Sequence, residues 1–433
     1  MLRHPTHHFF EMNPESLQAW CVDRRMPAFR AGQLLEWVYQ RGITDPEKMT
    51  NLSKLDRATI QREMAFESGQ VLQHMRASDG TQKLLVQWSD YATAGSATPG
   101  SENAGSENAG SENAGSENTG SADPVSADAG SRSILDPKSN PPIDRSTISL
   151  TQVPKPQGDP SRQTECVMIP SIPEEEGGDS DRFTACISSQ VGCPVGCRFC
   201  ASGLTGLDHN LSTGRIVEQV WRLSRMPDVR RISNVVFMGM GEPLANLPNV
   251  VPAVRTIAAP WGMGISARKI TISTVGLPKA IEKLAEQLDL PVTLALSLHA
   301  PTDELRRELI PWAEYTTIKD LLGACRAWFE RTGREITLEY TLLQNVNDRP
   351  EHAEELARLA RTLRANVNLI RYNEVAGLPF LRPYTQDVRN FQEILRSRGI
   401  NAHIRASRGR DIAAACGQLR HESAKGPKLA TAE

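Results

Sequence analysis

Three cysteines lie within eight residues of one another near the middle of the chain, at the spacing C-x3-C-x2-C: Cys193, Cys197 and Cys200. Thiolates are soft ligands that suit iron–sulfur clusters and zinc. A structural zinc site takes four protein ligands, often as two short pairs, and the sequence has no second C-x2-C pair. A four-iron cluster with one iron left open fits this pattern. Buried structural thiols, or a zinc ion with a further ligand from elsewhere in the chain, are the alternatives.

The same spacing resembles the signature of the radical S-adenosylmethionine (SAM) superfamily. The residues before the triplet, Cys186-Ile-Ser-Ser-Gln-Val-Gly-Cys193, resemble one branch of it, the RlmN/Cfr family of adenosine methyltransferases. The resemblance covers about residues 10–88 and 162–422. It implies that the three cysteines hold a [4Fe-4S] cluster, that the open iron binds the amino acid end of SAM, and that two SAM molecules are used per turnover.

The resemblance also implies three catalytic residues. Cys416, in Asp411-Ile-Ala-Ala-Ala-Cys-Gly-Gln-Leu419, would carry a methyl group as S-methylcysteine. Cys186 would release the product by forming a transient disulfide with Cys416, and Glu165 would act as proton acceptor. Without the resemblance, Glu165 is an ordinary surface carboxylate. A lone cysteine is usually a small buried hydrophobe, which is our interpretation of Cys21, Cys166 and Cys325.

Glycine and polar residues follow the C-terminal ends of several expected strands, where they could contact a cofactor. Glu242, in Gly239-Met-Gly-Glu-Pro-Leu244, could accept a hydrogen bond from an ammonium group, and glycines let the backbone approach a ligand closely. Singly, each of these residues is equally well explained as a local cap. As a set they match the SAM-binding positions of the family: Gly241, Glu242, Ser273, Ser297, Leu298, His299 and Asn373.

Strands and amphipathic helices alternate from about residue 162 onward. This alternation is typical of an α/β fold with a parallel sheet, and the resemblance implies a partial (β/α)6 barrel. The chemistry of such barrels lies in loops after the strands, and the cysteine triplet follows the first expected strand. The expected strands are Thr184–Ser188, Asn234–Phe237, Lys269–Ser273, Val292–Ser297, Glu335–Leu342 and Val367–Ile370.

Residues 1–90 are expected to form a small helical accessory domain that ends in a strand. Asn13-Pro14 is a plausible helix start, and Asp79-Gly80 is a turn signal before the apolar run Leu84–Val86. We expect this domain to bind RNA, although Lys54, Arg57 and Arg62 fit a solvated helix face as well as a phosphate-binding one. We interpret His4, His7 and His8 as part of a frayed polar terminus rather than a metal site.

Residues 91–161 are of low complexity, with Gly100-Ser-Glu-Asn-Ala104 repeated at period five. Such a segment buries too little apolar surface to offset its ordering entropy, so we expect a disordered insertion. Residues 90–160 carry a net charge of −6, and since the whole chain is at −2, the remainder is at +4. The expected regions are therefore 1–90, the insertion 91–161, the catalytic core 162–422 and a C-terminal tail 423–433.

The bulk properties favour an intracellular protein. The 433 residues include no apolar run long enough to cross a membrane, and the N-terminus lacks the apolar segment of a signal peptide. Eight cysteines, three of them clustered, do not form a disulfide framework, so we expect the reducing cytoplasm. The mildly basic remainder is compatible with a local RNA-binding face.

We therefore expect a monomeric methyltransferase that acts on carbon 2 of adenosine in 23S rRNA and tRNA and receives electrons from a flavodoxin-like donor. A Cfr-type enzyme, which methylates carbon 8, is an alternative that these motifs do not distinguish. A non-catalytic, metal-bound RNA-binding module is the alternative from another functional class.

Overall fold

Parallel strands in sequence order form the centre of the fold. The computed structural model describes residues 7–88, 162–171, 182–204 and 206–419, all within one compact unit. Each parallel strand pairs with the next one along the chain. These strands are β4 (Phe183–Cys186), β7 (Ile232–Phe237), β8 (Ile270–Thr274), β9 (Thr293–Ser297), β10 (Ile336–Leu342), β11 (Ala365–Arg371) and β12 (Ala402–Arg405).

Three antiparallel strands extend the same sheet beyond β4. They are β1 (Gly69–Arg76), β2 (Gln82–Trp88) and β3 (Gln163–Pro170), paired in the order β1-β2-β3-β4. The predicted turn at Asp79-Gly80 joins β1 to β2, and Gly80 has the positive φ of +80° that such a turn favours. A separate small sheet pairs β5 (Gln190–Gly192) with β6 (Leu207–Asn210).

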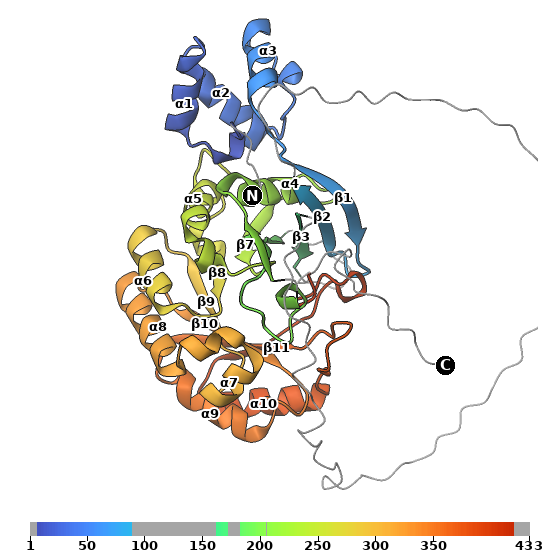
Figure 1. Cartoon of the computed structure of the whole chain (residues 1–433), viewed down its shortest axis with the longest axis vertical. Coiled ribbons are helices and arrows are strands. Elements are labelled where there is room, and N and C mark those ends of the chain that lie inside the picture. Colours follow the sequence, from blue (N-terminus) through green and yellow to red (C-terminus); the bar gives the residue numbers. More distant parts are fainter. Residues whose placement is uncertain (1–6, 89–161, 172–181, 205, 420–433) are drawn as a thin grey trace, which may run out of the picture. The chain divides into compact units, whose positions relative to one another are not determined.

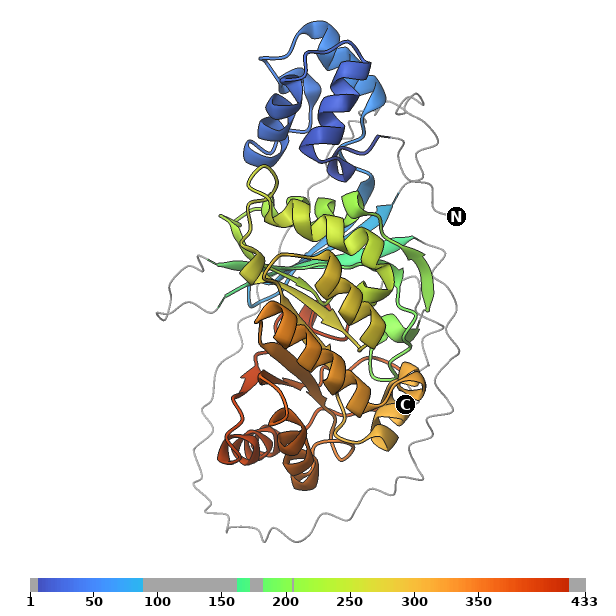
Figure 2. The same ribbon diagram turned by 90° about the vertical axis from the view of Figure 1, so that its left-hand side faces the viewer.

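Helices connect the parallel strands and lie along the outer side of the strand array in Figures 1 and 2. On α4, the apolar residues Ile216, Val217, Val220 and Leu223 follow helical spacing and are all buried. The helices are α4 (Thr213–Ser224), α5 (Leu247–Ala258), α6 (Pro278–Gln287), α7 (Asp303–Leu309), α8 (Ile318–Thr332), α9 (Pro350–Ala360) and α10 (Thr385–Ser397). The order of strands in the described sheet is open, from β1 to β12, so the predicted α/β partial barrel is confirmed.

The N-terminal helices share their hydrophobic core with the sheet and its helices. They are α1 (Pro14–Asp23), α2 (Arg30–Leu35), which continues as a π-helix to Gln40, and α3 (Lys54–Glu63). The predicted start of α1 is confirmed, since the Asn13 side chain accepts a hydrogen bond from the Ser16 amide. On α4, Trp221 Nε1 donates to the Val38 carbonyl at 2.9 Å.

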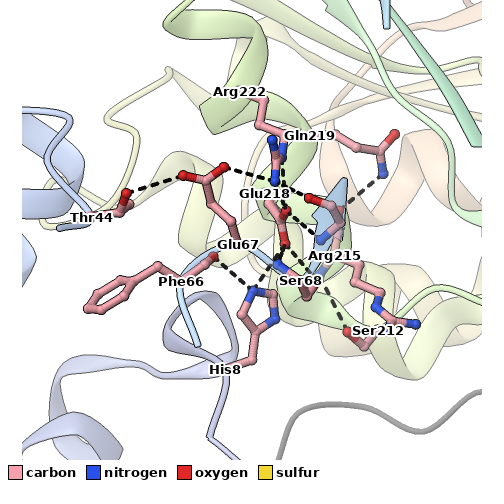
Figure 3. A network of polar contacts seen from close by, with 11 residues as sticks. His8, Thr44, Phe66, Glu67, Ser68, Ser212, Arg215, Glu218, Gln219 and Arg222 are labelled. Atoms are coloured by element: carbon pink, nitrogen blue, oxygen red, sulfur yellow. Dashed lines mark hydrogen bonds and ion pairs between the residues drawn. The ribbon is translucent and has the colours of Figure 1, made fainter. Parts of the chain in front are cut away.

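A buried polar network connects the N-terminal region to α4 (Figure 3). His8 Nε2 lies 3.2 Å from Glu218 Oε2, and both side chains are fully buried. The Ser68 amide and hydroxyl donate to the same carboxylate, and Arg222 makes an ion pair with it. Gly214 makes room for the imidazole, because a Cβ there would lie 2.3 Å from His8 Nδ1. The frayed-terminus interpretation is therefore wrong for His8.

The expected insertion 91–161 and the tail 423–433 lie outside the described residues, and so does His4. The described residues that flank the insertion are neighbours, since the Trp88 amide donates to the Arg162 carbonyl at 3.1 Å. No helix in the described part of the chain is both long enough and apolar enough to cross a membrane.

We predict that Glu218→Gln lowers the free energy of unfolding by about 3 kcal/mol at pH 7, as is typical when a buried ion pair loses one charge. Burial by itself raises the pKa of Glu218, but the His8 hydrogen bond, the charges of His8 and Arg222 and the Ser68 hydroxyl lower it to about 2. This pKa lies below the unfolded value of about 4.3. The stabilisation that ionised Glu218 gives to the folded protein is therefore complete above about pH 4.3 and is lost as the pH falls toward 2.

Denaturant unfolding followed by circular dichroism between pH 7 and pH 3 checks this prediction, and the difference between wild type and variant should shrink in acid. Glu355→Gln is the matched control, because Glu355 pairs with Arg358 on the exposed face of α9. A surface pair of this kind contributes only about 0.3–0.5 kcal/mol. Equal effects of the two substitutions would contradict a special role for the buried network.

Candidate active site

The three clustered cysteines lie on the loop after β5, beyond the end of the first parallel strand, as predicted. The loop is held by backbone contacts: the Cys193 amide donates to the Gly206 carbonyl at 2.8 Å, and the Cys200 amide donates to the Cys197 carbonyl at 3.2 Å. Gly196 has a φ of +69°, which glycine adopts without strain. The thiols line one cavity, here called the first cavity, together with residues at the C-terminal ends of β7 to β11.

The donor set of the triplet fits an iron–sulfur cluster. Burial raises the pKa of Cys193, Cys197 and Cys200, so each is a neutral thiol at pH 7 until a metal displaces its proton. Among the described residues, no three His, Cys, Asp or Glu side chains are grouped so that they could hold a single metal ion. The cysteines of a four-iron cluster bind separate irons, so the triplet does not need the spacing of a mononuclear site.

Two glycines after β7 let the backbone form part of the cavity wall. A Cβ on Gly239 would lie 2.7 Å from the Ile187 carbonyl oxygen. Gly241 has a φ of +103°, and its Cβ would lie 2.8 Å from Ser189 Oγ. A side chain at either position would therefore push this loop away from the segment after β4, so glycine is required for the close approach.

Glu242 is a buried carboxylate in the wall of the first cavity. Its Oε1 accepts from the Leu244 amide at 3.0 Å and its Oε2 from the Val275 amide at 2.7 Å. Burial raises the pKa of Glu242 to about 7, although these hydrogen bonds act in the opposite direction. The carboxylate thus caps its own loop and also faces the cavity, and its predicted contact with the methionyl amine stays a prediction.

Three other predicted cofactor residues line the same cavity: Ser273, Ser297 and His299. The two serine hydroxyls lie 3.2 Å apart at the ends of β8 and β9. His299 Nδ1 accepts from the Thr341 amide at 3.0 Å. Burial, with a smaller effect of the Arg306 charge, lowers the pKa of His299 to about 3, so this imidazole is neutral at pH 7.

Two of the predicted cofactor residues are not in the lining of the first cavity. Leu298 is fully buried, and its carbonyl accepts from Arg306 Nε. Asn373 lines a second cavity, and its Nδ2 donates to the Cys416 carbonyl at 3.2 Å. The structure therefore brings Gly241, Glu242, Ser273, Ser297 and His299 together and leaves Leu298 and Asn373 beside them.

Cys416 lies where the two cavities meet. It lines the first cavity with the cysteine triplet, and it also lines the second cavity, whose wall includes Cys186, Asn373 and Arg405. Among the described cysteines, Cys416 alone is exposed and alone lines both cavities. Cys416 thus shares the first cavity with Cys200 and the second cavity with Cys186.

Cys186 is a buried thiol at the end of β4. Burial and the nearby Cys416 raise its pKa to about 12, and the positive charge of Arg405 opposes this shift. A thiol of this pKa is a poor nucleophile at pH 7 until its surroundings change. The interpretation of Cys21, Cys166 and Cys325 as buried hydrophobic residues is confirmed.

Glu165 lies on β3 and is only 2% exposed, so its interpretation as an ordinary surface carboxylate is wrong. Its Oε1 lies 2.7 Å from Nζ of Lys83, which is equally buried. The Glu165 side chain lines neither of the two cavities described here. Its predicted role as proton acceptor stays a prediction.

Sequence reasoning missed several polar residues of the site. Glu339 and Thr341 line the first cavity near the end of β10, and a charged residue inside an apolar strand was the signal that could have found Glu339. Arg405 ends β12, a short strand that we did not predict, and its Nη1 lies 3.7 Å from Glu339 Oε2. Nothing local in the sequence distinguishes Lys83 or Arg306.

Comparison with known proteins agrees with this geometry. Residues 187–397 match the family model of the radical SAM superfamily, and residues 8–71 match the N-terminal domain of ribosomal RNA large subunit methyltransferases. A probable dual-specificity RNA methyltransferase RlmN of Rhodopirellula baltica is 36% identical over 95% of this chain and 90% of the relative. The dual-specificity RNA methyltransferase RlmN of Dichelobacter nodosus is also 36% identical, over 95% and 93%.

A solved structure resembles the whole chain. The crystal structure of a radical SAM methyltransferase from Sphaerobacter thermophilus superimposes with a TM-score of 0.75 at 34% identity, covering 96% of this chain and 99% of that protein. The similarity thus extends over both the N-terminal region and the sheet that carries the cysteine triplet. The chain belongs to the RlmN family of radical SAM methyltransferases.

Proposed function

We propose that this protein methylates carbon 2 of adenosine in 23S rRNA and in tRNA, with Cys416 as the carrier of the methyl group. The observation that carries the proposal is the position of Cys416, the one described cysteine that lines both cavities. A thiol at this junction is placed to receive a methyl group on the side of the cysteine triplet and to deliver it next to Cys186.

The bound cofactors would be a [4Fe-4S] cluster, held by Cys193, Cys197 and Cys200, and SAM. When bound, they supply the methyl group and, with one electron, a 5′-deoxyadenosyl radical able to remove a hydrogen atom. We propose that Gly241, Glu242, Ser273, Ser297 and His299 hold SAM through the wall of the first cavity, with Leu298 and Asn373 beside them. Two SAM molecules are then used per turnover, one as methyl donor and one as radical source.

The chemistry suits a carbon atom that does not act as a nucleophile. Carbon 2 of adenine is an electrophilic aromatic C–H position, so it does not displace a methyl group from a sulfonium as a nitrogen would. A carbon radical formed on the methyl group of Cys416 can add to it instead. The adenine must first leave its stack, at a cost of a few kcal/mol.

Three residues complete the reaction in this proposal. After the Cys416 methylene has bonded to carbon 2, the adduct would return one electron to the cluster, when that is bound, and Glu165 takes the ring proton. The Cys186 sulfur then attacks the Cys416 sulfur, so that an S–S bond forms and the S–C bond breaks. The carbon stays on the base and becomes a methyl group by protonation. Two electrons from the external donor then reduce the disulfide to two thiols for the next turnover.

The partners follow from this chemistry. The RNA substrates would be 23S rRNA and tRNA, since close relatives are named as dual-specificity RNA methyltransferases. A flavodoxin-like protein would supply electrons to a monomeric enzyme. Ribosomal RNA and such reductants place the reaction in the cytoplasm.

The first test is anaerobic reconstitution with iron, sulfide, SAM labelled in its methyl group, and 23S rRNA or tRNA. We expect labelled 2-methyladenosine, with one S-adenosylhomocysteine and one 5′-deoxyadenosine formed per methyl group transferred. Mass spectrometry and chromatography of the digested nucleosides measure all three. Only 8-methyladenosine would show the Cfr-type activity, and the absence of 5′-deoxyadenosine would indicate a non-catalytic RNA-binding protein.

A second prediction concerns the cysteine triplet. Changing Cys193, Cys197 or Cys200 to Ala should abolish iron binding and SAM cleavage. Each thiolate would bind a different iron of the cluster, so the loss of one leaves too few ligands to hold it. Cys325→Ala is the control, since that cysteine is buried in α8 and lines neither cavity. Iron analysis and electron paramagnetic resonance give the result, and a triple Ala variant with four irons would refute the assignment.

The third prediction separates the two remaining cysteines. Cys416→Ala should form no adduct with RNA, because the carrier of the methyl group is missing. Cys186→Ala should transfer the carbon to adenine and then stall, and so accumulate a protein–RNA crosslink through Cys416. Denaturing gels detect it as a shifted band that is sensitive to nuclease. Normal turnover by Cys186→Ala would exclude the resolving role, and RNA methylation by Cys416→Ala would exclude the whole scheme.

A further inference from the structure

Lys83 contacts both the candidate proton acceptor, Glu165, and the segment that carries Cys416, residues 409–419, here called the Cys416 segment. It lies on β2, is only 4% exposed, and its Nζ is 2.7 Å from Glu165 Oε1. The same Nζ donates to the Ala413 carbonyl at 3.2 Å. The Lys83 ammonium group therefore contacts β3 through a carboxylate and the Cys416 segment through a backbone carbonyl.

The strand register puts these groups on one face of the sheet. Lys83 is opposite Val167, and Val167 is opposite Cys186 on the next strand. Glu165 is two residues before Val167, so its side chain lies on the same face. That face is covered by the C-terminal segment, since Val167 and Cys186 pack with Ala414 and Leu419 in one hydrophobic cluster.

The turn before Lys83 holds the same segment a few residues upstream. The Ser78 amide donates to Asp411 Oδ2 at 2.8 Å, and the Gly409 amide donates to Asp79 Oδ2 at 2.9 Å. These contacts anchor the segment but do not reach Glu165. Lys83 is therefore the contact through which the β1–β2 hairpin acts on both Glu165 and the Cys416 segment.

We propose that Lys83 is a positioning residue for the methyl transfer, which holds the Glu165 carboxylate in register with the Cys416 segment. This inference rests on the proposed function, in which Glu165 takes the ring proton from the adduct on Cys416. The Lys83 ammonium group lines neither cavity and acts through Glu165. Without it, the proton is removed slowly and the adduct persists. The alternative is that Lys83 is only a structural anchor for the segment.

The test compares Lys83→Met and Lys83→Arg, each made in the wild-type and in the Glu165→Gln protein. Asp79→Ala is the matched control, because it loosens the same segment without touching Glu165. The measurements on reconstituted full-length enzyme are iron content, methylation of Cys416 by peptide mass, the rate of RNA methylation in a single turnover, and the crosslink on denaturing gels. The Lys83→Met/Glu165→Gln protein has no buried charge at either position. It should therefore fold even if a single substitution, which leaves one charge without its partner, does not.

With Lys83→Met we expect normal iron content and Cys416 methylation, RNA methylation slower by at least about 100-fold, the lower range for a general base, and accumulation of the crosslink. Lys83→Arg should recover most of the rate, because it keeps the charge. In the Glu165→Gln background, Lys83→Met should have no further effect beyond about twofold, since residues that act through one another are not additive. Asp79→Ala should slow both backgrounds by the same factor.

Several results would overturn the inference. One is methylation of RNA by Lys83→Met at the wild-type rate. Another is that Lys83→Met slows the wild-type and Glu165→Gln proteins by the same factor, as expected of Asp79→Ala, and Lys83 would then be a structural anchor only. Failure of Lys83→Arg to recover the rate would show that the charge is not what matters. If the wild-type enzyme itself carries no methyl group on Cys416 or makes no methylated RNA, the proposed function fails instead, and this control separates the two cases.

Discussion

Hydrogen bonds between segments far apart in the sequence hold Cys416 at the junction of the two cavities. The Ala201 amide donates to the Gly417 carbonyl at 2.8 Å, and Ser202 Oγ donates to the Leu419 carbonyl at 2.6 Å. An exposed cysteine has little packing of its own to fix its position. Its place beside the cysteine triplet therefore depends on these contacts. Every proposed step in which its sulfur forms or breaks a bond depends on them too.

The parallel part of the sheet could be predicted from sequence because its strands are buried and read as apolar runs separated by amphipathic helices. The antiparallel edge was harder. β1 exposes most of its residues to solvent and carries Gln70, Gln73 and His74, so it has no apolar run to recognise. β12 has four residues, two of them exposed, and its pairing with β11 comes from the sheet rather than from its own composition.

The candidate site likewise has residues that the sequence could predict and residues that it could not. The cysteine triplet and the strand-end residues follow one another in order along the chain, so local spacing predicted them. The buried contacts Lys83–Glu165 and His8–Glu218 join residues on different elements, and each partner looks like an ordinary polar residue in its own segment. Burial turns these residues into obligatory pairs, because an uncompensated charge in the interior is strongly unfavourable. Only the three-dimensional structure reveals which partners are brought together.

The contacts between the β1–β2 turn and the Cys416 segment join residues more than 300 positions apart, such as Ser78 and Asp411. A ribosome makes the hairpin more than 300 residues before the segment that closes over the sheet. The cysteine loop therefore leaves the ribosome before Ala414 to Leu419 exist to cover it. Contacts of such long sequence separation form late and slowly. Assembly of an oxygen-sensitive centre on this chain would thus meet a period in which its loop is complete but uncovered, and metal loading after release of the chain avoids that exposure.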